Sequence, residues 1–208
     1  MKRLIASVAL SLMCVAMWAD SPLTSTSFYE AYGEHPMVQL AASMISEGEA
    51  DLPIALMEFF ADQKQPVATR LAAVNAVGWN FNGTNTSHQF RDYLMTRFKA
   101  KNEKKLLKKI DAGTLAVYAY ACAMSDYFNV QNAQKLAHEA VKKDRTKSFS
   151  IAFIAALIDS QKYLDDDWCM VYKVVADVTH DGSLRLDMNQ AAIDAVMEYI
   201  NLYKEYCK

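Results

Sequence analysis

The segment from Trp79 to Thr86, WNFNGTNT, combines two aromatic residues with amides and hydroxyls. Aromatic rings supply flat apolar area, and amides supply paired hydrogen-bond donors and acceptors, so this mixture suits recognition of a peptide or a sugar. We expect the binding residues to be Trp79, Asn80, Phe81, Asn82 and Asn85, with Trp79 as the apolar anchor. Alternatively, the two rings tuck under the fold while the Asn and Gly residues form turns.

Residues typical of catalysis or metal binding show no recognisable arrangement. The four histidines are His35, His88, His138 and His180. None of them forms a metal-binding pair at helical spacing such as H-E-x-x-H, and a G-x-S-x-G elbow and a phosphate-binding glycine loop are both absent. The stretch 177–188 resembles a calcium loop in part, but Met188 stands where the ion needs a bidentate glutamate. We therefore expect no catalytic residue, metal or cofactor, although catalytic groups can also converge from distant helices.

A basic cluster follows between positions 91 and 109, where eight Lys and Arg residues accompany two acidic ones. Five of these lysines form a candidate surface for an anionic partner or a membrane face: Lys101, Lys104, Lys105, Lys108 and Lys109. Alternatively, the cluster is the solvated face of two helices, because lysines also favour helix C-termini.

The first nineteen residues are organised like a secretory signal peptide. Lys2 and Arg3 precede an apolar stretch over 4–18, and Ala19 is a small residue before a polar segment. We expect cleavage after Ala19, or alternatively after Ala16, and hence an exported protein that is periplasmic or secreted if its source is bacterial. The apolar stretch is shorter than the roughly 20 residues that a membrane-spanning helix needs, so no stable span is expected after cleavage.

Charge limits the choice of partner. The chain of 208 residues has a formal net charge of −2, which becomes −4 when Lys2 and Arg3 are removed with the signal peptide. Nucleic-acid-binding proteins are usually basic overall, so we expect no nucleic-acid partner.

Three cysteines remain after cleavage, and an odd number allows one disulfide at most. Export would place that bridge where it can persist. Cys122 lies inside an apolar run and is expected to be a buried free thiol. Cys169 and Cys207 lie near or at the ends of separate helical segments, and we expect these two to pair.

Apolar residues recur at helical spacing in nearly every segment, and alternating strand patterns are absent. The expected helices cover 27–32, 36–45, 51–60, 66–78, 87–100, 103–110, 114–129, 132–143, 148–161, 164–179 and 189–206. Short polar links join them. The sequence thus predicts an all-α domain over residues 20–208, with about ten helices in antiparallel pairs that stack as a short α-solenoid or an irregular bundle.

Two stretches resemble helical-repeat families. The stretch 51–79 resembles a HEAT repeat through an acidic loop residue, a proline that opens a helix, then Val and Arg, and small residues ending in glycine: Asp62, Pro66, Val67, Arg70, Ala72, Ala73, Ala76 and Gly78. The stretch 114–147 resembles a 34-residue tetratricopeptide repeat through small residues at the expected helix contact and an acid at the helix end: Ala121, Ala133, Ala140 and Asp144. Both resemblances imply paired helices stacked as a solenoid.

Together, these patterns favour a non-catalytic, exported helical-repeat protein that binds another macromolecule. The expected partner is a protein or peptide, with carbohydrate as the alternative. The competing hypothesis is an extracytoplasmic hydrolase with an unrecognised active site. A broad groove lined by successive helices would favour binding, whereas a deep pocket with clustered carboxylates or histidines would favour hydrolysis.

Overall fold

The computed structural model describes residues 20–47 and 51–208, so the expected signal peptide at 1–19 lies outside the described residues. In these ranges the chain forms helices and no strand, which confirms the all-α prediction. The α-helices are α2 (Pro36–Glu47), α3 (Ile54–Ala61), α4 (Val67–Val77), α5 (Thr86–Arg97), α6 (Glu103–Lys109), α7 (Ala112–Ser125), α8 (Gln131–Lys143), α9 (Phe149–Tyr163), α10 (Trp168–Thr179) and α11 (Gln190–Ile200). Two 3-10 helices, η1 (Phe28–Tyr32) and η2 (Asn201–Tyr206), flank this series.

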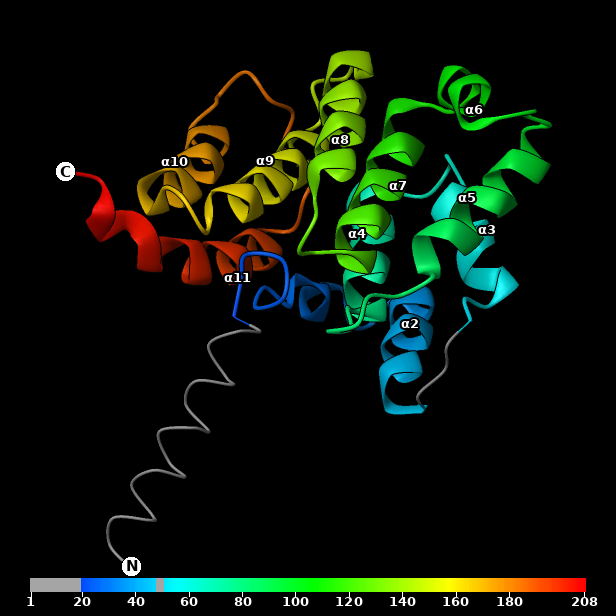
Figure 1. Cartoon of the computed structure of the whole chain (residues 1–208), viewed down its shortest axis with the longest axis horizontal. Coiled ribbons are helices and arrows are strands. Elements are labelled where there is room, and N and C mark those ends of the chain that lie inside the picture. The colour runs from blue at the N-terminus through cyan, green and yellow to red at the C-terminus, as the bar shows by residue number, and fades with distance from the viewer. Residues whose placement is uncertain (1–19, 48–50) are drawn as a thin grey trace, which may run out of the picture.

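Helix α7 lies at the centre of the molecule and is buried along most of its length. Alanines at 116, 119, 121 and 123 let neighbouring helices approach closely, and α7 packs against α4, α5, α8 and α9. Helices α7 to α10 follow one another across the molecule, each packed on the next (Figure 1). The buried hydrophobic side chains form one continuous cluster that includes residues of α2 to α11.

An N-terminal and a C-terminal element of the described chain pack against each other. Helix α11 packs against η1, and Figure 1 shows the last helix returning to the N-terminal segment. The backbone N–H of Asn189 donates to the Tyr32 hydroxyl at 2.9 Å. On the other side of η1, the Asn75 amide of α4 donates to the Thr26 carbonyl and accepts from the Tyr29 N–H. The helical series is therefore tied across its ends by specific hydrogen bonds.

Side-chain caps mark several helix starts. Asn102, Asp111, Ser148 and Asp167 each accept a hydrogen bond from a backbone N–H in the first turn of α6, α7, α9 and α10. The helix expected from Asp51 begins instead after Pro53, with no side-chain cap. Asp51 accepts a hydrogen bond from the Gln89 side chain, so it joins the segment before α3 to α5.

The helix expected over 114–129 ends earlier, at Ser125. The Asp126 carboxylate accepts a hydrogen bond from the Asn129 N–H at 3.2 Å, which offers the backbone an alternative to the helix. Tyr127 and Phe128 consequently belong to the link between α7 and α8. Because α7 ends early, these two aromatic residues can line the candidate binding site.

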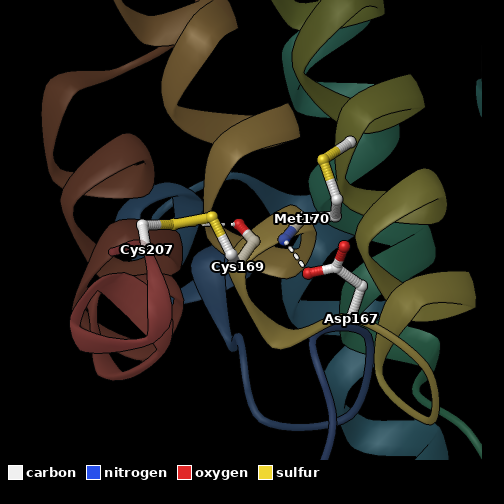
Figure 2. Close-up of a disulfide and its surroundings, with 4 residues drawn as sticks. All are labelled: Asp167, Cys169, Met170 and Cys207. Atoms are coloured by element: carbon white, nitrogen blue, oxygen red, sulfur yellow. Dashed lines mark hydrogen bonds between the residues drawn. A yellow bond between two sulfur atoms is a disulfide. The ribbon is translucent and has the colours of Figure 1, made fainter.

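Cys169 and Cys207 form a disulfide, which joins the first turn of α10 to the segment after η2 (Figure 2). Their Cα atoms are 4.7 Å apart, within the range that a bridge requires. Asp167, beside them, caps α10 by accepting from the Met170 N–H at 3.1 Å. Cys122 is a free thiol and is half-buried, whereas the sequence analysis expected full burial.

Candidate binding site at the aromatic loop

The link between α4 and α5, residues 79–85, is called the aromatic loop here. Gly78 ends α4 with a φ of 77°, a conformation that favours glycine. A turn follows, in which the Gly83 N–H donates to the Asn80 carbonyl at 2.8 Å and the Asn82 N–H donates to the Asn80 side chain at 2.9 Å. The asparagines thus form the turn, as one of the two sequence interpretations proposed.

Ser125, the last residue of α7, holds the end of this loop. Its carbonyl accepts from the Thr84 N–H at 3.0 Å, and its hydroxyl lies 2.9 Å from the Thr86 hydroxyl. The same hydroxyl accepts from the Ser87 N–H at 3.1 Å. A Cβ added at Gly83 would come within 3.0 Å of the Ser125 carbonyl, so glycine permits this close approach. Several hydrogen bonds to Ser125 therefore fix the aromatic loop to α7.

Four aromatic rings run from the core to the surface. Trp79 meets Tyr127 edge to face at 5.0 Å, Tyr127 stacks on Phe128 at 4.3 Å, and Phe128 meets Phe81 edge to face at 5.5 Å. Trp79 is partly buried against the core, whereas Phe81 and Phe128 are 52% and 60% exposed. A partner could therefore reach the rings of Phe81 and Phe128. Trp79 lies on the core side of this ring pair and contacts it through Tyr127.

A cavity of about 700 Å³ lies beside these rings. Its wall includes four of the five residues expected from the sequence, Asn80, Phe81, Asn82 and Asn85, but not Trp79. The remaining lining comes from the starts of α5, α6 and α8, from α7, and from the link after α7. Sequence reasoning missed Tyr127, Phe128, Asn129 and Asn132, because it placed the first three on a helix.

Phe128 also borders a second cavity, of about 560 Å³, which shares Tyr127, Phe128 and Asn129 with the first. The two hollows together extend the surface well beyond the aromatic loop. Gln131 and Gln161 line the second cavity, so amide side chains occur on both sides of the phenyl ring. An elongated partner could contact both cavities across Phe128.

Tyr118, Glu103 and Cys122 form a cluster of titratable side chains in the first cavity, whose wall also includes His88, Arg91 and Asp126. The Tyr118 hydroxyl donates to the Glu103 carboxylate at 2.8 Å, and burial together with this negative charge raises the pKa of Tyr118. Burial also raises the pKa of Cys122 to about 12, so its thiol is protonated at neutral pH. A protonated thiol is a poor nucleophile, and this group therefore offers hydrogen bonding rather than covalent chemistry.

The lysine surface expected from the sequence lies on and just before α6. Four of its members, Lys101, Lys104, Lys105 and Lys108, are exposed. Lys109 is also exposed, but its ammonium donates to the Phe98 and Lys99 carbonyls at 2.8 and 3.0 Å, at the end of α5. Lys109 thus satisfies carbonyls at a helix end, as one of the two interpretations of this cluster expects.

Comparisons with known proteins give this chain no relative: no protein-family model, no curated protein and no solved structure matches it. Within residues 20–47 and 51–208, no three His, Cys, Asp or Glu side chains are arranged to hold a metal ion. Over the same ranges, no helix combines the length and apolar character needed to cross a membrane.

Proposed function

We propose that the protein is exported and acts by binding another macromolecule at the aromatic loop. The observation that carries the proposal is the ring pair Phe81 and Phe128, which is more than half exposed and stands at a cavity of about 700 Å³ lined with amides. Large exposed rings are costly to leave in water, and they supply much of the binding energy where partners cover them. The hydrogen bonds of Ser125 hold this surface in place before binding, which lowers the ordering cost.

A protein segment or peptide is the partner that the lining favours. An Asn side chain presents one carbonyl and one amino group, the same donor and acceptor that a peptide bond presents. Asn80, Asn82 and Asn85 are therefore suited to an extended backbone, while the phenyl rings offer an apolar surface to a side chain. Carbohydrate is the alternative partner, to be distinguished by experiment.

Two features support export. The N-terminal sequence has the organisation of a signal peptide, and the disulfide between Cys169 and Cys207 is of a kind that persists in oxidising compartments. Cys122, the single thiol in the cavity wall, is protonated at neutral pH and is therefore a poor nucleophile. Glu103, one of the two carboxylates in this wall, is hydrogen-bonded to Tyr118.

Site-specific photo-crosslinking in the native cell tests this function. A benzoylphenylalanine placed at position 81 or 128 should capture the same partner, whereas the same group at Tyr206, an exposed aromatic site on η2, should not. Capture that is equally strong from position 206 contradicts the proposed site. In a second arm, the purified mature protein is screened against a random peptide library and a glycan array. Peptide hits lost in Phe128→Ala support a peptide partner, and glycan hits alone assign the site to carbohydrate.

A further inference from the structure

A third, separate cavity of about 450 Å³ lies where the α3–α4 link, the start of α7 and the segments 143–148 and 185–187 meet. It shares no lining residue with the cavity at the aromatic loop. Four cationic side chains contribute to its wall: Arg70, Lys143, Arg145 and Arg185. These four cations face three carboxylates in the same wall, so positive charge is in slight excess.

Arg70 is the most deeply buried of these cations, with 3% of its surface exposed. Its two hydrogen bonds to the described residues both leave from Nη1, to the Phe60 carbonyl and the Thr114 hydroxyl, each at 3.3 Å. Its Nε is buried without a partner. Within the described residues Arg70 forms no ion pair, and burial lowers its pKa although Asp111 and Asp62 act in the opposite direction. A buried charge without a direct counter-ion is costly, so this arrangement calls for an anion.

The position of the guanidinium increases that need. Gly113, in the first turn of α7, lines the same cavity, and a Cβ added there would lie 2.6 Å from Arg70 Nη2. The guanidinium therefore stands at the N-terminus of α7, the positive end of the helix dipole. The Asp111 carboxylate, which caps α7, offsets part of this positive charge, and an oxyanion that contacts Arg70 and the first turn of α7 would offset more of it.

Three carboxylates line the cavity, and each is already engaged by other groups. Asp111 accepts from the Thr114 N–H at 2.7 Å, and its charge acts on Arg70 without forming a direct ion pair. Both oxygens of Asp144 accept hydrogen bonds, from Thr146 and from the Ser148 N–H. Both oxygens of Asp187 accept as well, from serine groups at 148 and 150 and from Arg185. Arg145 takes part in none of the ion pairs of the described chain. Arg70 and Arg145 thus remain without a partner carboxylate.

We propose that this cavity binds a small oxyanion, a carboxylate or phosphate group, at Nη2 of Arg70. Nη1 is already committed to the protein and Nε is fully buried, so Nη2 is the donor of this guanidinium that remains for an anion. The first turn of α7 faces the same hollow and completes the positive environment, with Arg145 adding a further charge at the cavity wall. The proposal is independent of the function proposed for the aromatic loop.

Titration calorimetry on the mature chain tests the site, with inorganic phosphate and succinate in separate experiments at constant ionic strength. Saturable binding of either probe is expected, and the stronger one identifies the anion class. Arg70→Lys keeps the charge but removes the Nη2 donor, so it should weaken binding at least tenfold. Gly113→Ala displaces Nη2 and should act in the same direction. Lys173→Gln, which removes an exposed charge on α10 outside the cavity, should leave binding unchanged.

Circular dichroism establishes first that each variant folds. If Arg70→Lys fails to fold, binding by Gly113→Ala and Arg145→Gln tests the proposal instead. Arg145→Gln is expected to fold, because Arg145 is exposed and forms no ion pair within the described residues. The proposal is overturned if neither probe binds saturably. It is overturned equally if every folded variant of Arg70, Gly113 and Arg145 binds like the wild type, or if Lys173→Gln weakens binding as much as they do.

Discussion

The rings of Phe81 and Phe128 meet edge to face at 5.5 Å, although one follows α4 and the other follows α7. This contact positions two loops against each other, and it depends on the Thr84 N–H donating to the Ser125 carbonyl at 3.0 Å. The apolar part of the proposed site therefore arises from the packing of α4 and α7. Its outer rings face solvent and its inner ring, Trp79, faces the core.

Trp79 and Phe128 should respond oppositely to replacement by alanine. Trp79→Ala opens space against the core and should lower the free energy of unfolding by about 3 kcal/mol. Phe128→Ala removes an exposed ring and should change stability by less than about 0.5 kcal/mol. If Phe128 is a binding anchor, its loss should weaken partner binding by about 2 kcal/mol or more. Urea unfolding and binding measurements on the same variants check both parts.

Leu202→Ala is the matched control for this prediction, because Leu202 is 61% exposed but lies on η2, away from the cavity. It should alter neither stability nor binding. Equal binding by the wild type and Phe128→Ala would remove the ring pair from the recognition surface.

Asn75 should be among the most sensitive polar residues. Its amide donates to the Thr26 carbonyl at 3.1 Å and to the Tyr120 hydroxyl at 2.9 Å, and it accepts from the Tyr29 N–H at 3.0 Å. Asn75→Ala leaves these buried partners unsatisfied and should cost about 3 kcal/mol of stability. Asn82→Ala, in the exposed loop, should cost less than about 0.5 kcal/mol. Urea unfolding monitored by circular dichroism measures both, and similar losses would contradict a structural role for Asn75.

The helical architecture could be predicted from the sequence because it rests on local patterns. Apolar spacing indicated every α-helix, although the helix expected from residue 164 begins only at Trp168, after its cap Asp167. The amides of the aromatic loop were identified as candidates from composition alone, and Asn80, Asn82 and Asn85 line the cavity. Residue types and spacing carry this information without any tertiary contact.

Long-range contacts account for what the sequence could not reveal. The apolar spacing of α7 continues past Ser125, so it gave no warning that Tyr127 and Phe128 leave the helix. Trp79 was expected as the anchor because tryptophan is the largest ring, but packing against Tyr127 draws it inward. Arg70 belongs to a HEAT-like pattern, and only the tertiary structure brings it to Gly113 at the start of α7. Each of these facts depends on residues distant in the chain.

The disulfide should contribute a measurable share of stability. Cys169 and Cys207 are separated by 38 positions, and closing a loop of that size reduces the entropy of the unfolded chain by an amount equivalent to about 3–4 kcal/mol. Replacing both cysteines by serine should lower the free energy of unfolding by that order. Reductant should have the same effect on the wild type and no effect on the double variant. A wild type that is insensitive to reductant, despite complete reduction shown by mass, contradicts this prediction.

Cys122 should be an unreactive thiol although it lines a cavity. Burial raises its pKa from 9.0 to about 12, so at pH 7.5 its thiolate fraction is far below that of a free cysteine. Alkylation by iodoacetamide should be slower than that of a model thiol by a factor on the order of 100, even though a more basic thiolate is intrinsically more nucleophilic. The rate should rise with pH until about pH 12 or until the protein unfolds. Mass spectrometry without reductant follows Cys122 alone, because the other two described cysteines are paired.

The same shift has a consequence for stability. Because the pKa of Cys122 is higher in the folded state, the unfolded chain loses its proton first as the pH rises above about 9. Stability should therefore be unaffected by this group below pH 9 and should fall between about pH 9 and 12. Buried tyrosines with raised pKa values, such as Tyr118, act in the same direction. Cys122→Ala isolates the contribution of the thiol, since the variant should lose stability less steeply across this window. Identical pH profiles for the variant and the wild type, or rapid alkylation at pH 7.5, would show that Cys122 is not shielded as the structure requires.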